Sequence, residues 1–158
     1  MKHYLLITLI TCLSFSASAQ NQALGLRLNG GTIMQAEVTY QAWIADNNRL
    51  EIDAGFGGKS YLNVIKGTAL YQWCFDLEYP LQWYVGAGGS TGYWNYNAEY
   101  TAADDSGIFI NVAGQIGIDY TFDIPLQLSL DFRPEFSIIN GYTDDFDTGI
   151  GFGLRYTF

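Results

Sequence analysis

One short segment has the residue spacing of a hydrolase nucleophile. Gly88-Gly-Ser-Thr-Gly92 matches the G-x-S-x-G pattern, in which Ser90 would attack a carbonyl after a histidine removes its proton. The pattern requires a turn from a strand into a helix, whereas Tyr93 and Trp94 follow directly here. The only histidine is His3, near the start of the chain. We therefore interpret these glycines as strand residues, and we expect no catalytic residues and no enzyme activity.

Two carboxylates suggest a second kind of chemistry. Asp131 and Glu135 fall on one face of an expected strand, where a pair of acids could act as general acid and base. Arg133 lies between them on the same face, and Arg155 lies on the next expected strand. Buried charges require compensation, so we interpret these four residues as an ion-pair group in which the two arginines neutralise the two acids.

Acidic residues also gather in two of the expected loops. They lack the regular aspartate spacing and the closing glutamate of a calcium-binding loop. We expect solvated acidic loops, with no metal site and no cofactor, and calcium binding or cation-bridged contact with surface lipids is the alternative. The residues are Glu99, Asp104 and Asp105 in one loop and Asp144, Asp145 and Asp147 in the other.

Composition narrows the classes of function and fold. Asp+Glu 16 against Lys+Arg 7 gives a formal net charge of -9, and no basic patch is present that could follow a phosphate backbone. We therefore exclude nucleic-acid binding. Aromatic residues make up 16% of the chain and Gly numbers 18, a composition that favours strands. The apolar residues are dispersed, because after Phe15 no stretch approaches the roughly 18 apolar residues that a transmembrane helix needs.

Residues 1–19 have the form of a secretory signal peptide. A basic start at Lys2 precedes an apolar core and an Ala-x-Ala site ending at Ala19. We expect cleavage after Ala19, and residues 20–158 are long enough for one domain. The alternative is a lipid anchor on Cys12, but the apolar stretch continues past that residue.

From Ala23 onward, apolar or aromatic residues alternate with polar, small or charged residues. This period of two predicts β-strands, each with one apolar and one polar face. Eight such segments can be counted, which is an even number. They cover about residues 24–29, 34–44, 50–56, 65–78, 81–88, 108–120, 128–138 and 150–158.

The connections between these segments alternate in length. Short turns at 46–49, 79–81 and 123–125 alternate with longer loops at 57–63, 92–106 and 140–148, and only the connection at 30–32 departs from the rule. Short turns at one rim and long loops at the other are typical of outer-membrane barrels, whose short turns face the periplasm. Pro134 lies within the seventh segment and predicts a bulge or a local gap in the strand pairing.

The polar face decides between a soluble and a membrane protein. A lipocalin-like barrel or a sandwich would bury the apolar face, leaving the polar face in water. Here the polar face is sparse, mixed with small residues and charged in the middle of the strands, which suits a narrow interior. We therefore predict an all-β, eight-stranded antiparallel transmembrane up-and-down barrel. Its expected interior charge network comprises Arg27, Glu37, Glu51, Asp53, Lys66, Asp76, Asp119, Asp131, Arg133, Glu135 and Arg155.

Aromatic residues gather near both predicted rims, as in the aromatic girdles at the two membrane interfaces. On the short-turn side these are Trp43, Tyr79, Trp83, Tyr120, Tyr156 and Phe158, and on the long-loop side Tyr61, Tyr93, Trp94, Tyr96 and Tyr142.

The carboxyl-terminal segment, Gly153-Leu-Arg-Tyr-Thr-Phe158, has a glycine, aromatics on one face and a terminal phenylalanine. With the signal peptide and the eight segments, residues 21–158 resemble the small OmpA/OmpX-like outer-membrane barrels of the porin family. The resemblance implies a bacterial outer-membrane location among outer-membrane lipids. It also implies an assembly signal at Gly153, Tyr156 and Phe158, recognised by periplasmic chaperones and the barrel-assembly machinery. Lipid A-modifying barrels of this size use a catalytic histidine, which the chain after residue 19 does not supply.

Three functions follow from these expectations. Eight strands leave an interior just wide enough for side chains to fill, which predicts a non-enzymatic barrel acting in envelope structure or surface interaction. The alternative is a narrow cation-preferring channel, because parity places four cations against eight carboxylates inside. A lipid-modifying enzyme is the third candidate. Tyr93, Trp94, Tyr96 and Tyr100 form a candidate binding surface, or else they continue the strands and the girdle.

Overall fold

The computed structural model describes residues 22–96, 106–139 and 145–158. Alternating polarity produces eight strands, each with one face inside and one outside. The strands are β1 (Gln22–Gly30), β2 (Gln35–Ala45), β3 (Asn48–Lys59), β4 (Leu62–Glu78), β5 (Leu81–Tyr96), β6 (Ser106–Thr121), β7 (Leu126–Ile139) and β8 (Phe146–Thr157). Among the residues described, no helix is long and apolar enough to cross a membrane.

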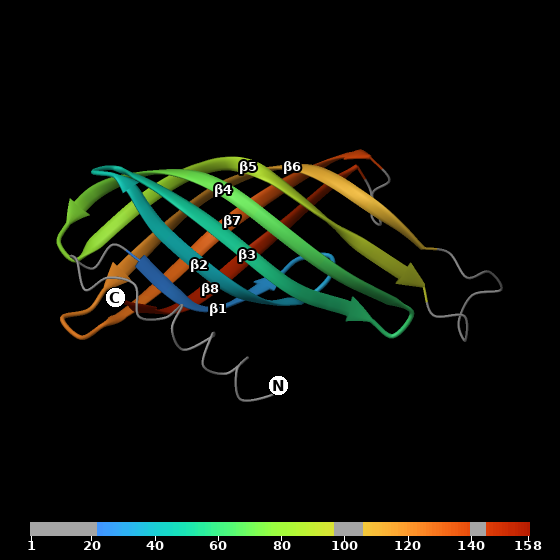
Figure 1. Cartoon of the computed structure of the whole chain (residues 1–158), viewed down its shortest axis with the longest axis horizontal. Helices are drawn as coiled ribbons and strands as arrows, with labels where there is room; N and C mark the ends of the chain where they lie inside the picture. The colour runs from blue at the N-terminus through green and yellow to red at the C-terminus, as the bar shows by residue number, and fades with distance from the viewer. Residues whose placement is uncertain (1–21, 97–105, 140–144) are drawn as a thin grey trace, which may run out of the picture.

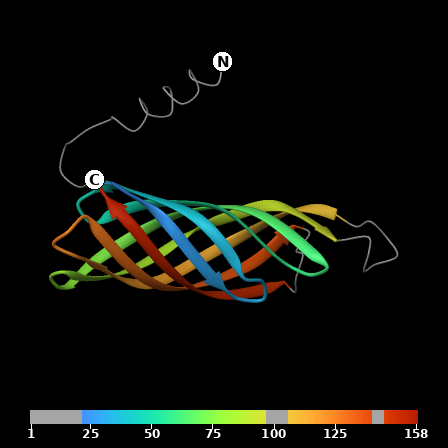
Figure 2. The same ribbon diagram turned by 90° about the horizontal axis from the view of Figure 1, so that it is seen from below.

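The strands form a closed ring in chain order (Figures 1 and 2). Every neighbouring pair is antiparallel, and β8 pairs with β1 through a ladder from Ala23 opposite Thr157 to Gly30 opposite Ile150. Closure removes the two edge strands, whose unpaired backbone groups could not be satisfied in lipid. The predicted eight-stranded antiparallel up-and-down barrel is confirmed.

The two ends of the barrel differ. The turn end, on the left in Figure 1, carries the C-terminus and the three short connections at residues 46–47, 79–80 and 122–125. The loop end carries the connections after β1, β3, β5 and β7. Strands β4, β5 and β6 are the longest, with 16 or 17 residues, and they extend furthest at the loop end (Figure 1).

The predicted long connection at residues 57–63 is wrong. Gly57, Gly58 and Lys59 continue β3 and pair with β4, so only residues 60–61 separate the two strands. The Gly, Tyr and Asn residues of this stretch had indicated a loop, but the β3–β4 ladder continues to Lys59 opposite Leu62. The predicted irregularity at Pro134 is present: the β6–β7 register continues past it, yet Gly114 and Gln115 have no paired residue on β7.

The barrel is apolar outside and charged inside. Leu26 and Ile150 point outward and are 63% and 62% exposed, whereas Arg27 and Arg133 are at most 1% exposed. A protein surrounded by water shows the opposite arrangement, since ionic groups cost several kcal/mol to desolvate and apolar groups gain by burial. A lipid environment accounts for the apolar exterior, and the fold is that of a transmembrane barrel.

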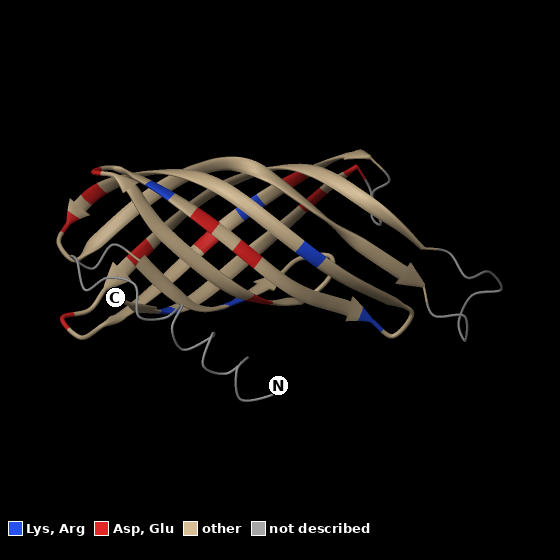
Figure 3. Ribbon diagram, in the orientation of Figure 1, with Lys and Arg blue, Asp and Glu red and all other residues tan. Residues whose placement is uncertain are grey.

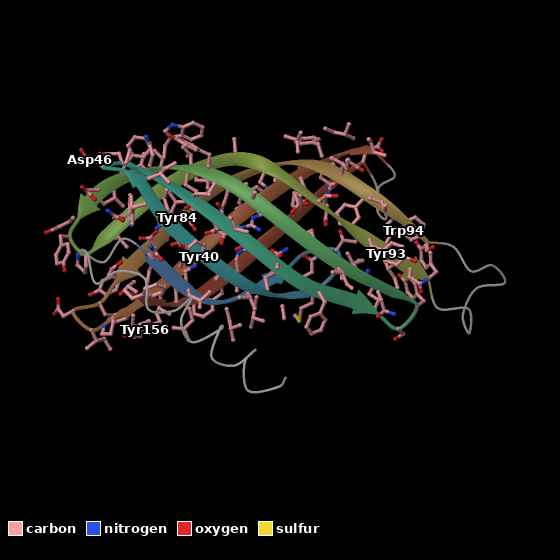
Figure 4. All side chains as sticks on the ribbon, viewed as in Figure 1. Tyr40, Asp46, Tyr84, Tyr93, Trp94 and Tyr156 are labelled. Carbon is pink, nitrogen blue, oxygen red and sulfur yellow. The ribbon has the colours of Figure 1, made fainter. Side chains whose placement is uncertain are left out.

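Three members of the expected girdles have the interior strand parity instead. Trp43 follows Gln41 at the interior parity of β2, Trp94 is 9% exposed at the interior parity of β5, and Tyr96 shares the parity of Trp94 and packs against it. All three were assigned to girdles from their nearness to a rim, although strand parity directs them inside. Tyr93, by contrast, is 46% exposed on the outer face of β5. Figure 4 shows Tyr93 and Trp94 together at the loop end and Tyr156 near the turn end. Tyr142 lies outside the described residues.

Candidate functional site: the charged interior

Ten of the eleven predicted interior charges are buried. They come from seven of the eight strands and lie in the middle of the barrel (Figure 3). The buried residues are Arg27, Glu37, Glu51, Asp53, Lys66, Asp119, Asp131, Arg133, Glu135 and Arg155.

Asp76 is the exception. It has the interior parity of β4 but lies at the turn end, where it is exposed and accepts a hydrogen bond from Gln82 Nε2 at 2.6 Å. The neighbouring acid Glu78 is exposed as well. Parity alone placed these two carboxylates inside, but the last residues of a strand open into water whichever way they point. Asp76 is therefore not part of the buried network.

The centre of the network is an arginine–carboxylate cluster. Arg133 Nη2 lies 2.7 Å from Glu51 Oε1 and 2.8 Å from Asp53 Oδ2. Arg155 Nη2 lies 3.0 Å from the other oxygen of Glu51. These contacts join β3, β7 and β8 across the interior, so that Glu51 is held between two guanidinium groups.

Arg27 extends the cluster toward β2. Its Nε and Nη2 atoms donate to the two oxygens of Asp131 at 3.1 and 2.6 Å, a bidentate geometry that suits the planar guanidinium. Its Nη1 donates to Glu37 Oε2 at 2.6 Å. The expected pairing of Asp131 and Glu135 with Arg133 and Arg155 is wrong, because these side chains reach across the interior instead of along their own wall.

Near the turn end, sequence reasoning missed Arg49 by assigning it to a turn. Arg49 is fully buried, with Nη2 2.9 Å from Asp119 Oδ2 and Nε donating to Gln72 Oε1 at 2.6 Å. Its guanidinium carbon lies 5.0 Å from the ring centroid of Tyr84 and 5.3 Å from that of Trp43. Its parity in β3, shared with Glu51, was the signal that could have placed it inside.

Toward the loop end, Glu135 is the centre of a smaller group. Lys66 Nζ lies 2.8 Å from Glu135 Oε1, while Ser90 Oγ and Asn111 Nδ2 donate to Oε2 at 2.7 and 3.0 Å. Ser90, the residue of the hydrolase-like pattern, is thus a hydrogen-bond donor within the continuous strand β5.

Glycines of β8 provide the room that the arginines occupy. Gly151 faces the interior, and a Cβ atom at this position would collide with the Arg27 guanidinium. At Gly153 a Cβ would lie 2.9 Å from Arg155 Nη1. The glycine-rich carboxyl-terminal strand therefore has an interior packing role. Of the predicted assembly signal, Tyr156 is 57% exposed on the outer face, and Phe158 exchanges two backbone hydrogen bonds with Gln22.

An apolar cluster lies in the interior at the loop end. Trp94 and Phe109 are buried there, and Tyr96 packs against them, with its ring centroid 5.4 Å from that of Trp94 and 6.2 Å from that of Tyr61. Ile33, Leu62 and Val64 complete the loop-end plug.

This plug changes the candidate binding surface. Trp94 is buried and cannot contact a partner at the surface, and Tyr96 is only partly exposed. Tyr93 remains exposed on the outer wall, together with Tyr61 at the β3–β4 turn. Tyr100 lies outside the described residues, as do Glu99, Asp104, Asp105 and Asp144 of the expected acidic loops.

The interior charges nearly balance. Among the described residues, five buried cations face six buried carboxylates. The predicted count was four against eight; Arg49 adds one cation, and Asp76 and Glu78 are exposed to water. Within the part of the chain that the structure describes, no group of three metal-ligating side chains is assembled. A small cavity of about 50 Å³ opens among Gln41, Trp43 and Gln127 at the turn end. Chemically, the arrangement is a compensated salt-bridge network.

The sequence matches no family model, and no curated protein is detectably similar to it. Solved structures are similar in fold. The N-terminal β-barrel domain of Pseudomonas aeruginosa OprF matches with a TM-score of 0.73 at 11% identity, over 88% of this chain and 98% of that domain. Neisserial surface protein A matches with a TM-score of 0.66 at 14% identity, over 87% and 95%. The outer-membrane enzyme PagL matches with a TM-score of 0.51 at 10% identity, over 86% and 99%. The chain therefore has the eight-stranded outer-membrane barrel fold of the OmpA/OmpX-like type.

Proposed function

We propose that this protein is a non-enzymatic outer-membrane barrel that acts through its exterior, in envelope structure or in surface interaction at its loop end. The observation that carries the proposal is the filled interior. Arg27, Arg49, Arg133 and Arg155 are at most 1% exposed, and each has a carboxylate partner. A barrel of this width cannot hold such a network and a wide aqueous pore together.

The loop end offers the surface for an interaction. The exposed Tyr61 and Tyr93 lie there, and Tyr61 is stacked on Tyr96 with an angle of 9° between the rings. Rigid aromatic side chains provide contact area at a low cost in conformational entropy. Lys59, two residues before Tyr61, is exposed at the end of β3. By the short-turn rule for outer-membrane barrels, this end faces the outside of the cell.

A deletion strain tests the proposal. Loss of an envelope barrel should increase uptake of a hydrophobic dye such as N-phenylnaphthylamine, and the wild-type gene should reverse the increase. If the role is structural, a Tyr61→Ala/Tyr93→Ala variant should restore the barrier fully. If the role is surface interaction, the deletion should leave dye uptake unchanged. Wild-type cells should then adhere to immobilised glycan or matrix surfaces, and cells carrying the double variant should not. A strain lacking both phenotypes would contradict the proposal.

The channel alternative is supported by the excess of one buried carboxylate and by the polar cavity at the turn end. Planar-bilayer recording separates it from the filled barrel. We expect no steady conductance from the purified protein, whereas a stable, cation-selective conductance would favour the channel.

The enzyme alternative is supported by the fold shared with PagL. Lipid A mass profiles from cells with and without the protein test it. We expect identical profiles. A shift that disappears in a Glu135→Gln variant would establish chemistry at an interior carboxylate and contradict the proposal.

A further inference from the structure

The outer wall of the barrel contains a groove that the proposed function does not use. It has a volume of about 450 Å³ and crosses four strands, from near the turn end of β5 to the middle of β7 and β8. Its apolar lining consists of Trp83, Ile116, Ile118, Leu130, Phe132 and Ile150. The volume is within the range of about 300–1,000 Å³ found for small-molecule sites.

Strand pairing explains how the groove is built. Trp83, Ile118 and Leu130 lie side by side in one row across three strands. Ile116, Phe132 and Ile150 form the next row toward the loop end. Two aromatic residues, Trp83 on β5 and Phe132 on β7, flank the isoleucines of β6. Phe75 on β4 supports the Trp83 ring from outside the groove, with centroids 4.6 Å apart and an angle of 22°.

The floor of the groove is thin. Gly117 and Asp131 also line it, and they are paired residues whose side-chain positions face the interior. On the interior side the fully buried Tyr84 lies against Gly117, where a Cβ atom would be 2.6 Å from Tyr84 Cζ. Only the backbone of β6 therefore separates the groove from Tyr84. Interior packing and groove shape are fixed by the same residues.

We infer that this groove binds one acyl chain of a phospholipid from the turn-side leaflet of the membrane. The groove is continuous with the lipid-facing exterior, and its lining side chains are apolar. No unpaired polar side chain lines it, so a headgroup would gain nothing there, while a flexible hydrocarbon chain fills a furrow between rings. Four of its six apolar lining residues, Trp83, Ile116, Ile118 and Leu130, lie in the turn-end half of their strands, which favours the periplasmic leaflet.

Two tryptophans make a matched test. Trp83 is in the groove, and Trp73 lies on the outer face of the neighbouring strand β4. Trp73 pairs with Val85, which is two residues from Trp83 along β5. Trp73 is 43% exposed and does not line the groove. Two full-length proteins each keep one of these tryptophans, with Phe at the other three Trp positions. Both are folded in detergent micelles and titrated with a phosphatidylethanolamine carrying brominated chains, which quench nearby tryptophan.

The lipid mole fraction that quenches half of the tryptophan fluorescence should be about fourfold lower for the Trp83 protein than for the Trp73 protein. This corresponds to about 0.8 kcal/mol, the value of one additional buried methylene group. Phe132→Ala removes one wall and should bring Trp83 to the behaviour of Trp73. Phe136→Ala makes the same change on the outer face of β7, outside the groove, and should leave the preference intact.

Equal titration of the two tryptophans, or a Trp83 preference that survives Phe132→Ala, would overturn the inference. If Trp83 is protected from quenching by the brominated lipid and dilution of the protein removes the protection, a second copy of the chain occupies the groove. That result would also overturn acyl-chain binding. Heat-modifiable gel mobility verifies that every variant is folded, so a null result cannot arise from unfolding.

Discussion

Arg133 on β7 approaches three interior carboxylates that belong to two other strands. It contacts Glu51 and Asp53, and its Nη1 lies 3.7 Å from Glu37 Oε2. Such a residue reaches from β7 to β2 and β3 through the barrel interior. Removing it leaves buried carboxylates without their cation, which is more costly than the net value of the ion pairs themselves.

We predict that Arg133→Met lowers the free energy of unfolding by about 3–5 kcal/mol. Urea titration of the barrel in micelles, followed by tryptophan fluorescence, measures the change. Lys59→Met removes an exposed cation at the loop end and should change stability by less than about 0.5 kcal/mol. Equal effects of the two substitutions would show that the interior cluster is not compensated as described.

Gly151 gives a second residue-level prediction. Gly151→Ala places a methyl group against the Arg27 guanidinium and should destabilise the barrel by about 1–3 kcal/mol through overpacking. Gly67→Ala is the matched control, since the nearest atoms to its Cβ would be 4.0 Å away. The same urea titration compares them, and a larger loss at Gly67 would refute the packing role of Gly151.

Residue positions inside the barrel could largely be predicted from parity, and the failures have physical causes. Arg49 was missed because a polar Asp-Asn-Asn-Arg run resembles a turn, although its parity matches Glu51. Asp76 has interior parity but lies where the interior meets water. Which cation meets which carboxylate could not be predicted, because Arg27 and Asp131 are brought together only by closure of the ring.

At the scale of elements, β8 closes the barrel against β1. Phe158 N donates to Gln22 O at 2.9 Å, Gln22 N donates to Phe158 O at 3.2 Å, and the Phe158 ring lies 6.2 Å from Tyr156. These two backbone bonds are a small part of the β1–β8 ladder. A severe defect on losing Phe158 would therefore reflect recognition during assembly rather than loss of stability.

We predict that deletion of Phe158 lowers the amount of folded barrel in cells while the purified chain still folds in detergent. Comparison of heat-modifiable gel mobility in the two settings measures this difference. Phe158→Tyr keeps a terminal aromatic ring and should restore the yield in cells. A normal yield after the deletion would show that the terminal residue is not an assembly signal.

Element boundaries were harder to predict than element number. Gly57–Lys59 continue β3 because their backbones pair with β4, and a hairpin of two residues follows. Trp94 and Tyr96 continue β5 and turn into the interior, where they meet Phe109. Local composition suggested loops in both places, and the cross-strand ladder overrode it.

The whole molecule has an interior of graded polarity. An apolar plug occupies the loop end, ion pairs fill the middle, and amide and hydroxyl side chains line the small cavity at the turn end. Exposed acids, including Asp46 and Asp123, surround the turn end, and Figure 4 places Asp46 at that rim. Water can therefore reach the polar side chains at the turn end, while the outer wall faces lipid.

The outer wall of the membrane barrel includes the even-numbered residues of β8, which should face lipid. Spin labels at Ile150, Phe152 and Leu154, introduced as single cysteines in a Cys74→Ala background, test it in phospholipid vesicles. We predict that oxygen, which dissolves in lipid, relaxes these labels strongly, whereas a water-soluble nickel chelate does not. Labels at Asp46 and Lys59, exposed at opposite ends, should show the reverse. Strong relaxation of the three β8 labels by the nickel chelate would contradict the membrane barrel.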